Sequence, residues 1–326
     1  MATITNTTST TAAGNATYLN KTYYDRNLLE NAKTKFVHTK FGQKRGIPKN
    51  NGKRVEFRKW TMFDPSVVVT GLTEGVTPDG QNLAQTRVEA IVAQYGAYVE
   101  VSDLLKTTSY DDVMEGATDM LGEQVGTAIE WVTRNEMNSG NNVQYAGGKT
   151  SRDALEATDV LTVTEIRKAV RTLKKNKAKM FTSGEGGAVR KPHFVCICSP
   201  DATYDLQSDQ LWQDVSKYSN AEQIYSGEIG RLFGVVFVES TEAKVFMSED
   251  GETVLAHSTL VFGREAYGTI DIEGSGAMET IIKGLGSGGT SDPLNQRCTV
   301  AAKVGAYAAK ILNDEWLVRI EHMVTA

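Results

Sequence analysis

Two segments in which apolar and polar residues alternate, joined by a long polar stretch, place the strongest constraint on how this chain can fold. "RVEFRKW", residues 54–60, places Val55 and Phe57 on one side of a strand, and "TRVEAIVAQYGAYVEVS", residues 86–102, also alternates, with a phase slip beside Gly96 that indicates a bulge or sharp twist. Residues 61–85 between them are rich in Gly, Thr, Pro and Asp and are too long for a tight turn. The pattern predicts a protruding two-stranded arm. Because two strands bury too little apolar area to offset backbone ordering, the arm must lie against something else.

A long amphipathic helix is predicted directly after the arm. Ser102 can cap it, Asp103 falls in its first turn, and apolar residues follow helical spacing from Val113 to about Met137. About thirty-five residues at 1.5 Å each would span roughly 50 Å, which is longer than a small domain is wide. We therefore expect a spine on which other elements pack.

Apolar and polar residues alternate again in the C-terminal segment. Val300, Ala302, Val304, Ala306 and Ala308 precede the turn "LNDE", and Trp316, Val318 and Ile320 follow it, so two antiparallel closing strands are predicted. Alanine forms strands poorly, and small side chains leave room for a wide neighbour. We expect Ala302, Ala306 and Ala308 to face the spine helix.

Composition sets limits on the compartment and the partners. The 326 residues include 35 basic and 40 acidic side chains, and the net charge of -5 argues against tight binding to nucleic acid over the whole surface. No apolar run approaches eighteen residues, and "MATITNTTSTTAAGNAT" lacks the features of a secretory signal. Three cysteines fit reduced thiols better than a disulfide framework. The chain is expected to be made in a cytosol and to have no membrane partner.

Residues 192–273 alternate between strand and helix patterns and predict a separate α/β lobe, with "GLGSGG" as the return linker. The strand "HFVCICSP" holds Cys196 and Cys198 on one face near His193, but too few further ligands remain for a zinc site. We interpret both cysteines as core residues.

The remaining motifs predict no catalytic, cofactor or metal site. "GGKT", residues 147–150, lacks the first glycine of a phosphate-binding loop and is expected to follow a helix rather than a strand. His257 lies in no nucleophile motif. The basic run Arg167 to Lys179 surrounds an amphipathic helix and is interpreted as a solvated face.

Four ordered motifs carry a family resemblance. "NGKRVEFRKW", "GLTEGVTPDGQNL", "VFGREAYGTIDIEG" and "DPLNQRCTVAAKVGAYAAKILNDEWLVRIEH" resemble the N4-type major capsid proteins of tailed bacteriophages, from about Thr22 to the C-terminus. The resemblance implies an α+β fold of the Hong Kong 97 type. Its parts would be an N-terminal arm (1–45), an extended hairpin loop (46–102), a peripheral domain with the spine helix (103–191), an axial domain (192–275), and a return to the peripheral domain with closing strands (276–326).

The resemblance also implies a function. The chain would be a structural subunit, not an enzyme, that assembles as hexamers and pentamers into an icosahedral shell around double-stranded DNA, in a bacterial cytoplasm. Portal proteins and scaffold or decoration proteins would be its partners. A scaffold is expected to be a separate protein, because the chain begins only about twenty residues before the matching region. At the hairpin tip we expect inter-subunit contacts from Gly71, Glu74, Pro78 and Asp79, whose glycines and proline fix the chain path while the acids reach a neighbour.

Two alternatives stay open at this point. An encapsulin-like compartment would keep the fold and enclose protein cargo instead of a genome. An α/β enzyme domain in residues 192–275 would instead require a pocket with convergent polar groups and acids of perturbed pKa.

Overall fold

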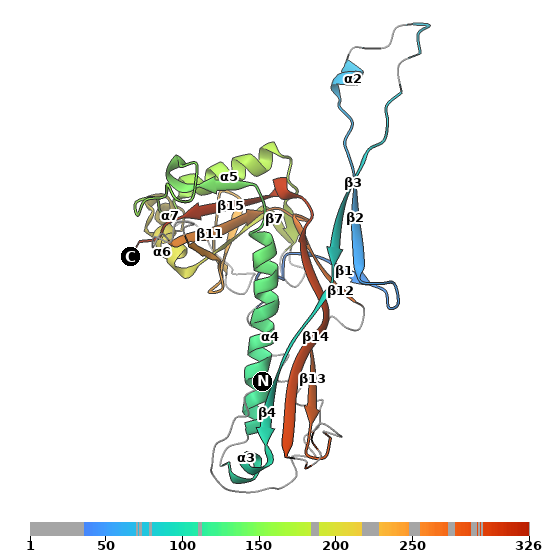
Figure 1. Cartoon of the computed structure of the whole chain (residues 1–326). Helices are drawn as coiled ribbons and strands as arrows, with labels where there is room; N and C mark the ends of the chain where they lie inside the picture. Colours follow the sequence, from blue (N-terminus) through green and yellow to red (C-terminus); the bar gives the residue numbers. More distant parts are fainter. Residues whose placement is uncertain are drawn as a thin grey trace.

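A computed structural model describes residues 36–69, 71, 74–77, 80–109, 113–183, 189–216, 228–247, 255–272, 278–287, 292, 294 and 296–325. Figure 1 shows three parts: a long helix that lies along one sheet, a lobe beside one end of that helix, and a ribbon that extends away from both. Helices and strands are mixed rather than alternating in one repeat, so the α+β class is confirmed.

The sheet along the helix has five strands in the described residues. It is ordered β1-β12-β14-β13, and β4 pairs with β14 as well. Its strands are β1 (Gln43–Ile47), β4 (Ala93–Ser102), β12 (Tyr267–Ile272), β13 (Met278–Lys283) and β14 (Arg297–Ile311). The long strand β14 pairs with β4, β12 and β13, so it is the central strand of this sheet.

The spine is shorter than the sequence predicts. The expected single helix consists of α3 (Asp103–Thr108) and α4 (Val113–Met137). The Ser102 hydroxyl accepts a hydrogen bond from the Leu105 amide, which confirms the predicted cap, but Ser109 is extended and ends α3 after one and a half turns. The 25 residues of α4 span about 37 Å at 1.5 Å each.

A bulge in β14 changes which alanines face the spine. The register with β4 shifts between Val304 and Tyr307. An extra residue reverses the alternation of side chains, because strand positions repeat every two residues. Ala302 therefore packs in the cluster with α4, whereas Ala306 and Ala308 lie in a different cluster on the opposite face of β14. Tyr307 takes the helix-facing position, and its hydroxyl lies 2.7 Å from Thr133 Oγ1 on α4.

The predicted pairing of the two closing strands is wrong. After β14, the 3-10 turn η5 (Asp314–Trp316) leads into β15 (Leu317–His322), which joins the lobe and pairs with β11 and β5. The alternation of Arg319 and Glu321 suggested a half-exposed strand, but both faces of β15 are buried. Glu321 is fully buried and forms ion pairs with Arg152 at 2.8 Å and Arg319 at 2.9 Å, so charged residues occur here inside the lobe.

The lobe contains an eight-stranded sheet in which six strands have the order β5-β15-β11-β7-β9-β8, while β10 pairs with β11 and β6 pairs with β7. Its strands are β5 (Val143–Tyr145), β6 (Phe181–Ser183), β7 (Val189–Cys198), β8 (Glu228–Leu232), β9 (Val235–Glu239), β10 (Val245–Met247), β11 (Leu255–Phe262) and β15. The helices that accompany it are η2 (Ala146–Gly148), α5 (Val163–Lys175), α6 (Pro200–Ser208) and α7 (Gln210–Ser216).

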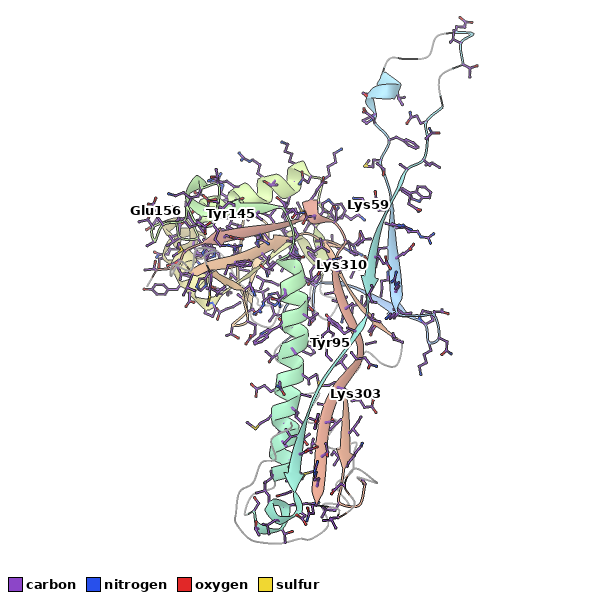
Figure 2. All side chains as sticks on the ribbon, in the orientation of Figure 1. Lys59, Tyr95, Tyr145, Glu156, Lys303 and Lys310 are labelled. Carbon is purple, nitrogen blue, oxygen red and sulfur yellow. The ribbon has the colours of Figure 1, made fainter. Side chains whose placement is uncertain are left out.

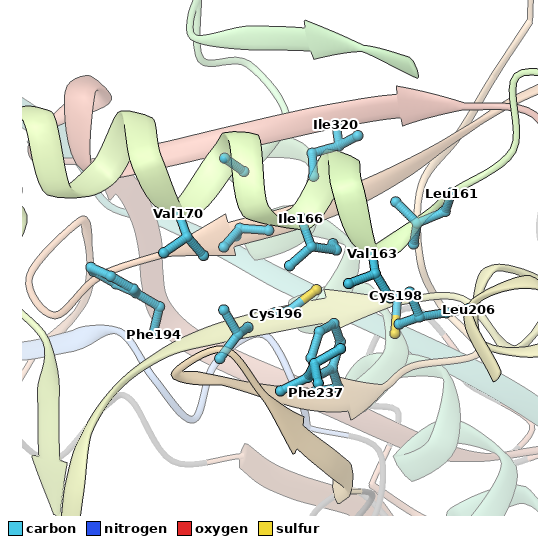
Figure 3. Close-up of a cluster of buried hydrophobic side chains, with 14 of the residues drawn as sticks. Leu161, Val163, Ile166, Val170, Phe194, Cys196, Cys198, Leu206, Phe237 and Ile320 are labelled. Atoms are coloured by element: carbon cyan, nitrogen blue, oxygen red, sulfur yellow. The ribbon is translucent and has the colours of Figure 1, made fainter. Parts of the chain in front are cut away.

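The two faces of the lobe sheet bury separate cores. Helix α5 packs Val163, Ile166 and Val170 over one face, where Cys196 and Cys198 are fully buried (Figure 3). The prediction that these thiols are core residues is confirmed. The opposite face buries the end of α4 and an aromatic group of Phe41, Phe262 and Tyr267.

Candidate inter-subunit surface

The ribbon consists of β2 (Arg54–Trp60) and β3 (Gln85–Ile91), which pair with each other in a separate two-stranded sheet. Beyond Trp60 the chain continues through the short helix α2 (Ser66–Val69) to the tip and returns without further ladder pairing in the part described. Figure 1 shows this arm pointing away from the helix and the lobe. The prediction of a protruding hairpin is confirmed.

One face of the ribbon is held by its own subunit. Val55 and Phe57 on β2 pack beside Ala90 on β3 in the cluster that includes Ala306 and Ala308. Lys59 lies over the ring of Trp316, 5.5 Å from its centroid, at the root of the arm (Figure 2). A groove of about 520 Å³ separates this face from the lobe. The arm is thus anchored only at its root.

The other face of the ribbon is uncovered. Side chains alternate along β2, so Arg54, Glu56, Arg58 and Trp60 lie opposite to the anchored face. All four are exposed in the described structure. Because none of the described residues covers this face while Val55 and Phe57 pack on the other side, the ribbon resembles half of an interface.

Apolar side chains are exposed along the outer half of the arm. Trp60 is 59% exposed, Met62 83% and Leu83 69%, and Phe63, Val68 and Val76 are exposed as well. A single exposed apolar residue needs no explanation, but a series of them on one thin element marks an interaction surface. The outer half of the arm is therefore a candidate contact surface.

The predicted tip residues lie partly in the described structure. Gly71 has a φ of 67° and is exposed, and Glu74 is exposed. The φ of Gly71 explains a glycine at this position, since other residues adopt that conformation at a cost. Pro78 and Asp79 lie outside the described residues. The role of all four in contacts between subunits remains a prediction.

A buried carboxylate on the spine anchors the chain just before the ribbon, and sequence reasoning did not find it. Glu130 Oε1 accepts hydrogen bonds from the amides of Val37 (2.9 Å) and His38 (2.8 Å), and lies 2.6 Å from His38 Nδ1. Tyr267 donates to the His38 carbonyl, and burial raises the pKa of this tyrosine well above its usual value. A single glutamate within an amphipathic helix gave no signal, because its partners are distant in sequence.

The lobe contains a cluster of polar side chains that does not have the geometry of a hydrolase active site. Ser199 Oγ lies 3.2 Å from His257 Nδ1, and Asp201 Oδ2 is 4.0 Å from the same nitrogen. Because the serine and the aspartate face one ring nitrogen, the carboxylate cannot orient the ring for proton transfer from the hydroxyl. Burial lowers the pKa of His257 and lowers that of His322 to about 4, so both rings are neutral at pH 7.

The two remaining sequence motifs lie on the side of the lobe that carries α5. Contrary to the prediction, "GGKT" follows a strand, β5, because α4 has already ended at Met137; however, the next helix begins only at Val163. Lys149 Nζ is bound by Glu156 at 2.6 Å, which raises the lysine pKa. Most basic residues of α5, including Arg171 and Lys174, are exposed, as a solvated face requires, whereas Lys168 is half-buried and pairs with Glu165 at 2.7 Å.

Comparison with known proteins supports a structural role. A family described as phage capsid protein matches residues 131–278, less than half of the chain. The chain is 34% identical over 70 residues to the major capsid protein of Escherichia phage T5, which is 22% of this chain and only 14% of the length of that relative. The TM-score against the capsid of Ralstonia phage GP4 is 0.66, with 16% identity and 89% of both chains covered.

A virus-like particle from Pyrococcus furiosus also has this fold, with a TM-score of 0.51 and 11% identity over 92% of this chain and 98% of that one. The chain therefore has the fold of phage capsid proteins, and part of its sequence is similar to that family. Among the described residues, no helix is long and apolar enough to cross a membrane.

Proposed function

We propose that the chain is a phage major capsid protein, a structural subunit that assembles with copies of itself into an icosahedral shell. The observation that carries this proposal is the arm: a ribbon with one face anchored, one face uncovered and exposed Trp60, Met62 and Leu83 beyond it. A monomeric protein gains nothing from such an element, because two strands do not stabilise themselves in water. Repeated in every subunit, the same arm supplies the contacts that a closed shell requires.

The fold assigned to the subunit is of the Hong Kong 97 type, with the N4-type capsid proteins as the family. In these terms the ribbon is the extended loop, α4 the spine helix of the peripheral domain, and the lobe the axial domain. We assign β5, α5 and β15 to the axial domain as well, unlike the expected bounds of 192–275, because β5 and β15 pair in the lobe sheet and α5 packs on it. We infer that hexamers and pentamers of the chain form the shell. The packing of the five-stranded sheet along α4 supports this inference, because it gives a body from which the arm can reach a neighbour.

The packaged double-stranded DNA is expected to touch the shell weakly and without sequence preference. The net charge of -5 supports this expectation, since gripping many phosphates needs an excess of Lys and Arg. Portal and scaffold or decoration proteins are expected as further partners, and assembly is expected in the cytoplasm of a bacterial host. No cofactor or metal is part of the proposal.

A second function keeps the shell and changes its content. The likeness to a virus-like particle favours this alternative specifically, because such a particle is a shell with the same fold. In that case the chain would form an encapsulin-like compartment that holds protein cargo. An enzyme function of the lobe is not proposed, since Ser199, His257 and Asp201 lack a catalytic arrangement.

Expression of the chain alone, followed by sedimentation and electron microscopy, tests the proposal. Closed particles, or hexamers and pentamers, are the expected result. A stable monomer at concentrations of tens of micromolar, with and without a co-expressed scaffold, would contradict it. Nuclease treatment and analysis of particles from the native source then distinguish DNA from protein as the content.

A further inference from the structure

A groove of about 520 Å³ lies between the root of the ribbon and the lobe. Phe57 and Val88 line it from the ribbon, where they are directly opposite each other on the anchored face. Leu312 and Trp316 line it from the segment that joins β14 to β15. All four side chains are half-buried, so apolar surface from two separate parts of the fold faces the groove. A concave apolar site of this volume is large enough to hold a small organic molecule.

The carboxylates of this groove already have partners. Glu56 Oε2 lies 3.6 Å from Arg58 Nη2, and both side chains line the groove. Glu265 Oε2 lies 2.7 Å from Lys179 Nζ on the lobe side. Among the described residues no other carboxylate lines the groove, so its acidic charge is compensated within these two pairs.

Arg45 and Lys59 give the groove a surplus of positive charge. Both line it, and neither forms an ion pair with a residue that the structure describes. The Lys59 ammonium lies 5.5 Å from the ring centroid of Trp316, and the Lys179 ammonium lies 5.7 Å from the same ring, so two cations lie near one wall of the groove. Figure 2 shows Lys59 at the root of the arm. The charged side chains therefore attract an anion, while the walls favour an apolar body.

We infer that this groove binds a small amphipathic carboxylate, a linear apolar chain that ends in one carboxyl group. The apolar chain lies against Phe57, Val88 and Leu312, where it removes exposed apolar surface from water. The carboxylate pairs with Lys59, and Arg45 adds to the positive potential of the groove. A neutral apolar molecule leaves both cations without a partner, and a cationic one is repelled by them.

A ligand in this groove contacts the ribbon on one side and the lobe segment on the other. The ribbon is otherwise held at its root by the cluster around Val55 and Phe57 and by the contact of Lys59 with Trp316. The bound ligand therefore braces the arm against the lobe, and hydrogen exchange of the β2 and β3 amides becomes slower. Binding itself goes beyond the proposed function and does not depend on it; only the effect of this brace on assembly rests on that function.

Isothermal titration calorimetry of the full chain with decanoate tests the site. Decanoate is expected to bind with a Kd below about 1 mM. Decyltrimethylammonium, which has the same apolar chain and the opposite charge, should bind about tenfold more weakly or not at all. The variant R45Q/K59Q removes both surplus cations and should weaken decanoate binding about tenfold. The matched control K49Q/K53Q removes two exposed lysines outside the groove and should bind decanoate like the wild type.

The variant V88F fills the groove and should abolish decanoate binding, with circular dichroism to verify that each variant folds. The inference is overturned if millimolar decanoate does not bind the wild type, or if V88F or R45Q/K59Q binds it as tightly as the wild type does. Equal binding of decyltrimethylammonium and decanoate would overturn the carboxylate as the ligand class. These titrations report binding whether or not the chain assembles, so their failure is distinguishable from a failure of the proposed function.

Discussion

The stability of the lobe should fall as the pH is lowered from 6.5 to 4, because His322 is buried as a neutral ring. Its Nδ1 faces the Met323 carbonyl at 2.8 Å and therefore carries the proton, and its Nε2 accepts from Thr259 Oγ1 at 2.9 Å. Protonation at Nε2 would break this arrangement and charge a ring that lies 6.2 Å from His257.

The size and sign of this change in stability follow from the pKa of His322 in the folded state and from its ordinary value. The folded value is about 4 and the ordinary value is 6.5. Between these pH values the unfolded state binds more protons, so stability decreases as the pH falls through this range and does not decrease further on this account below pH 4. A difference of about 2.5 pKa units corresponds to roughly 3 kcal/mol at about 1.36 kcal/mol per unit. His257, whose pKa is also lowered by burial, acts in the same direction.

Urea unfolding of the isolated subunit at several pH values between 7.5 and 4 measures this loss. The variant H322Q removes the titrating ring and should reduce the pH dependence by most of the 3 kcal/mol expected from His322. The control T259V loses the hydroxyl beside Nε2 but keeps the buried ring, so it should be less stable at pH 7.5 and retain most of the wild-type pH dependence, because burial is the main cause of the lowered pKa of His322. An unchanged pH dependence in H322Q would refute the reasoning.

Two further predictions concern the sheet and the charge of the subunit. Replacing Ala302, Ala306 or Ala308 with Phe should overpack a buried site and cost about 1 to 3 kcal/mol in thermal unfolding. Leu121→Ala on α4 should partly relieve Ala302→Phe but not Ala306→Phe, because only Ala302 shares a cluster with that leucine; equal relief of both would show that the bulge is misplaced. Purified subunits should bind duplex DNA weakly, with affinity that falls as salt rises. Tight binding that is lost on neutralising Lys174, Lys175 and Lys177 would contradict a solvated basic helix.

The sequence predicted two kinds of element: those held by contacts between residues close in sequence, and those whose apolar residues repeat with the period of a strand or a helix. The ribbon, the Ser102 cap and the buried strand with Cys196 and Cys198 follow from alternation and spacing alone. The division of the spine was missed because one serine inside a helical pattern is a weak stop signal, yet Ser109 has an extended backbone and its amide donates to the Leu105 carbonyl at the end of α3.

The errors at the C-terminal end have a physical cause as well. An extra residue in β14 leaves the pattern of small side chains intact in sequence while it reverses their faces in space, so Ala306 and Ala308 could not be placed from alternation. Arg319 and Glu321 resemble solvent-facing residues until Arg152, distant in sequence, supplies the ion pair that allows their burial. In the ribbon Arg58 lies directly opposite Arg87, and this pairing depends on a strand register that a loop of this length does not fix.

The central claim is that the arm is a contact between subunits rather than part of the subunit's own core. Deleting Gly71 to Gly80, with Glu74, Pro78 and Asp79, and joining the strands by a short Gly-rich turn removes the tip but keeps the anchored root of β2 and β3. Circular dichroism and thermal unfolding report the fold, and sedimentation with electron microscopy reports assembly. We predict a folded, soluble subunit that no longer forms shells. Closed particles of normal size and stability would show that the tip is not a required contact, and loss of folding would show that it belongs to the core.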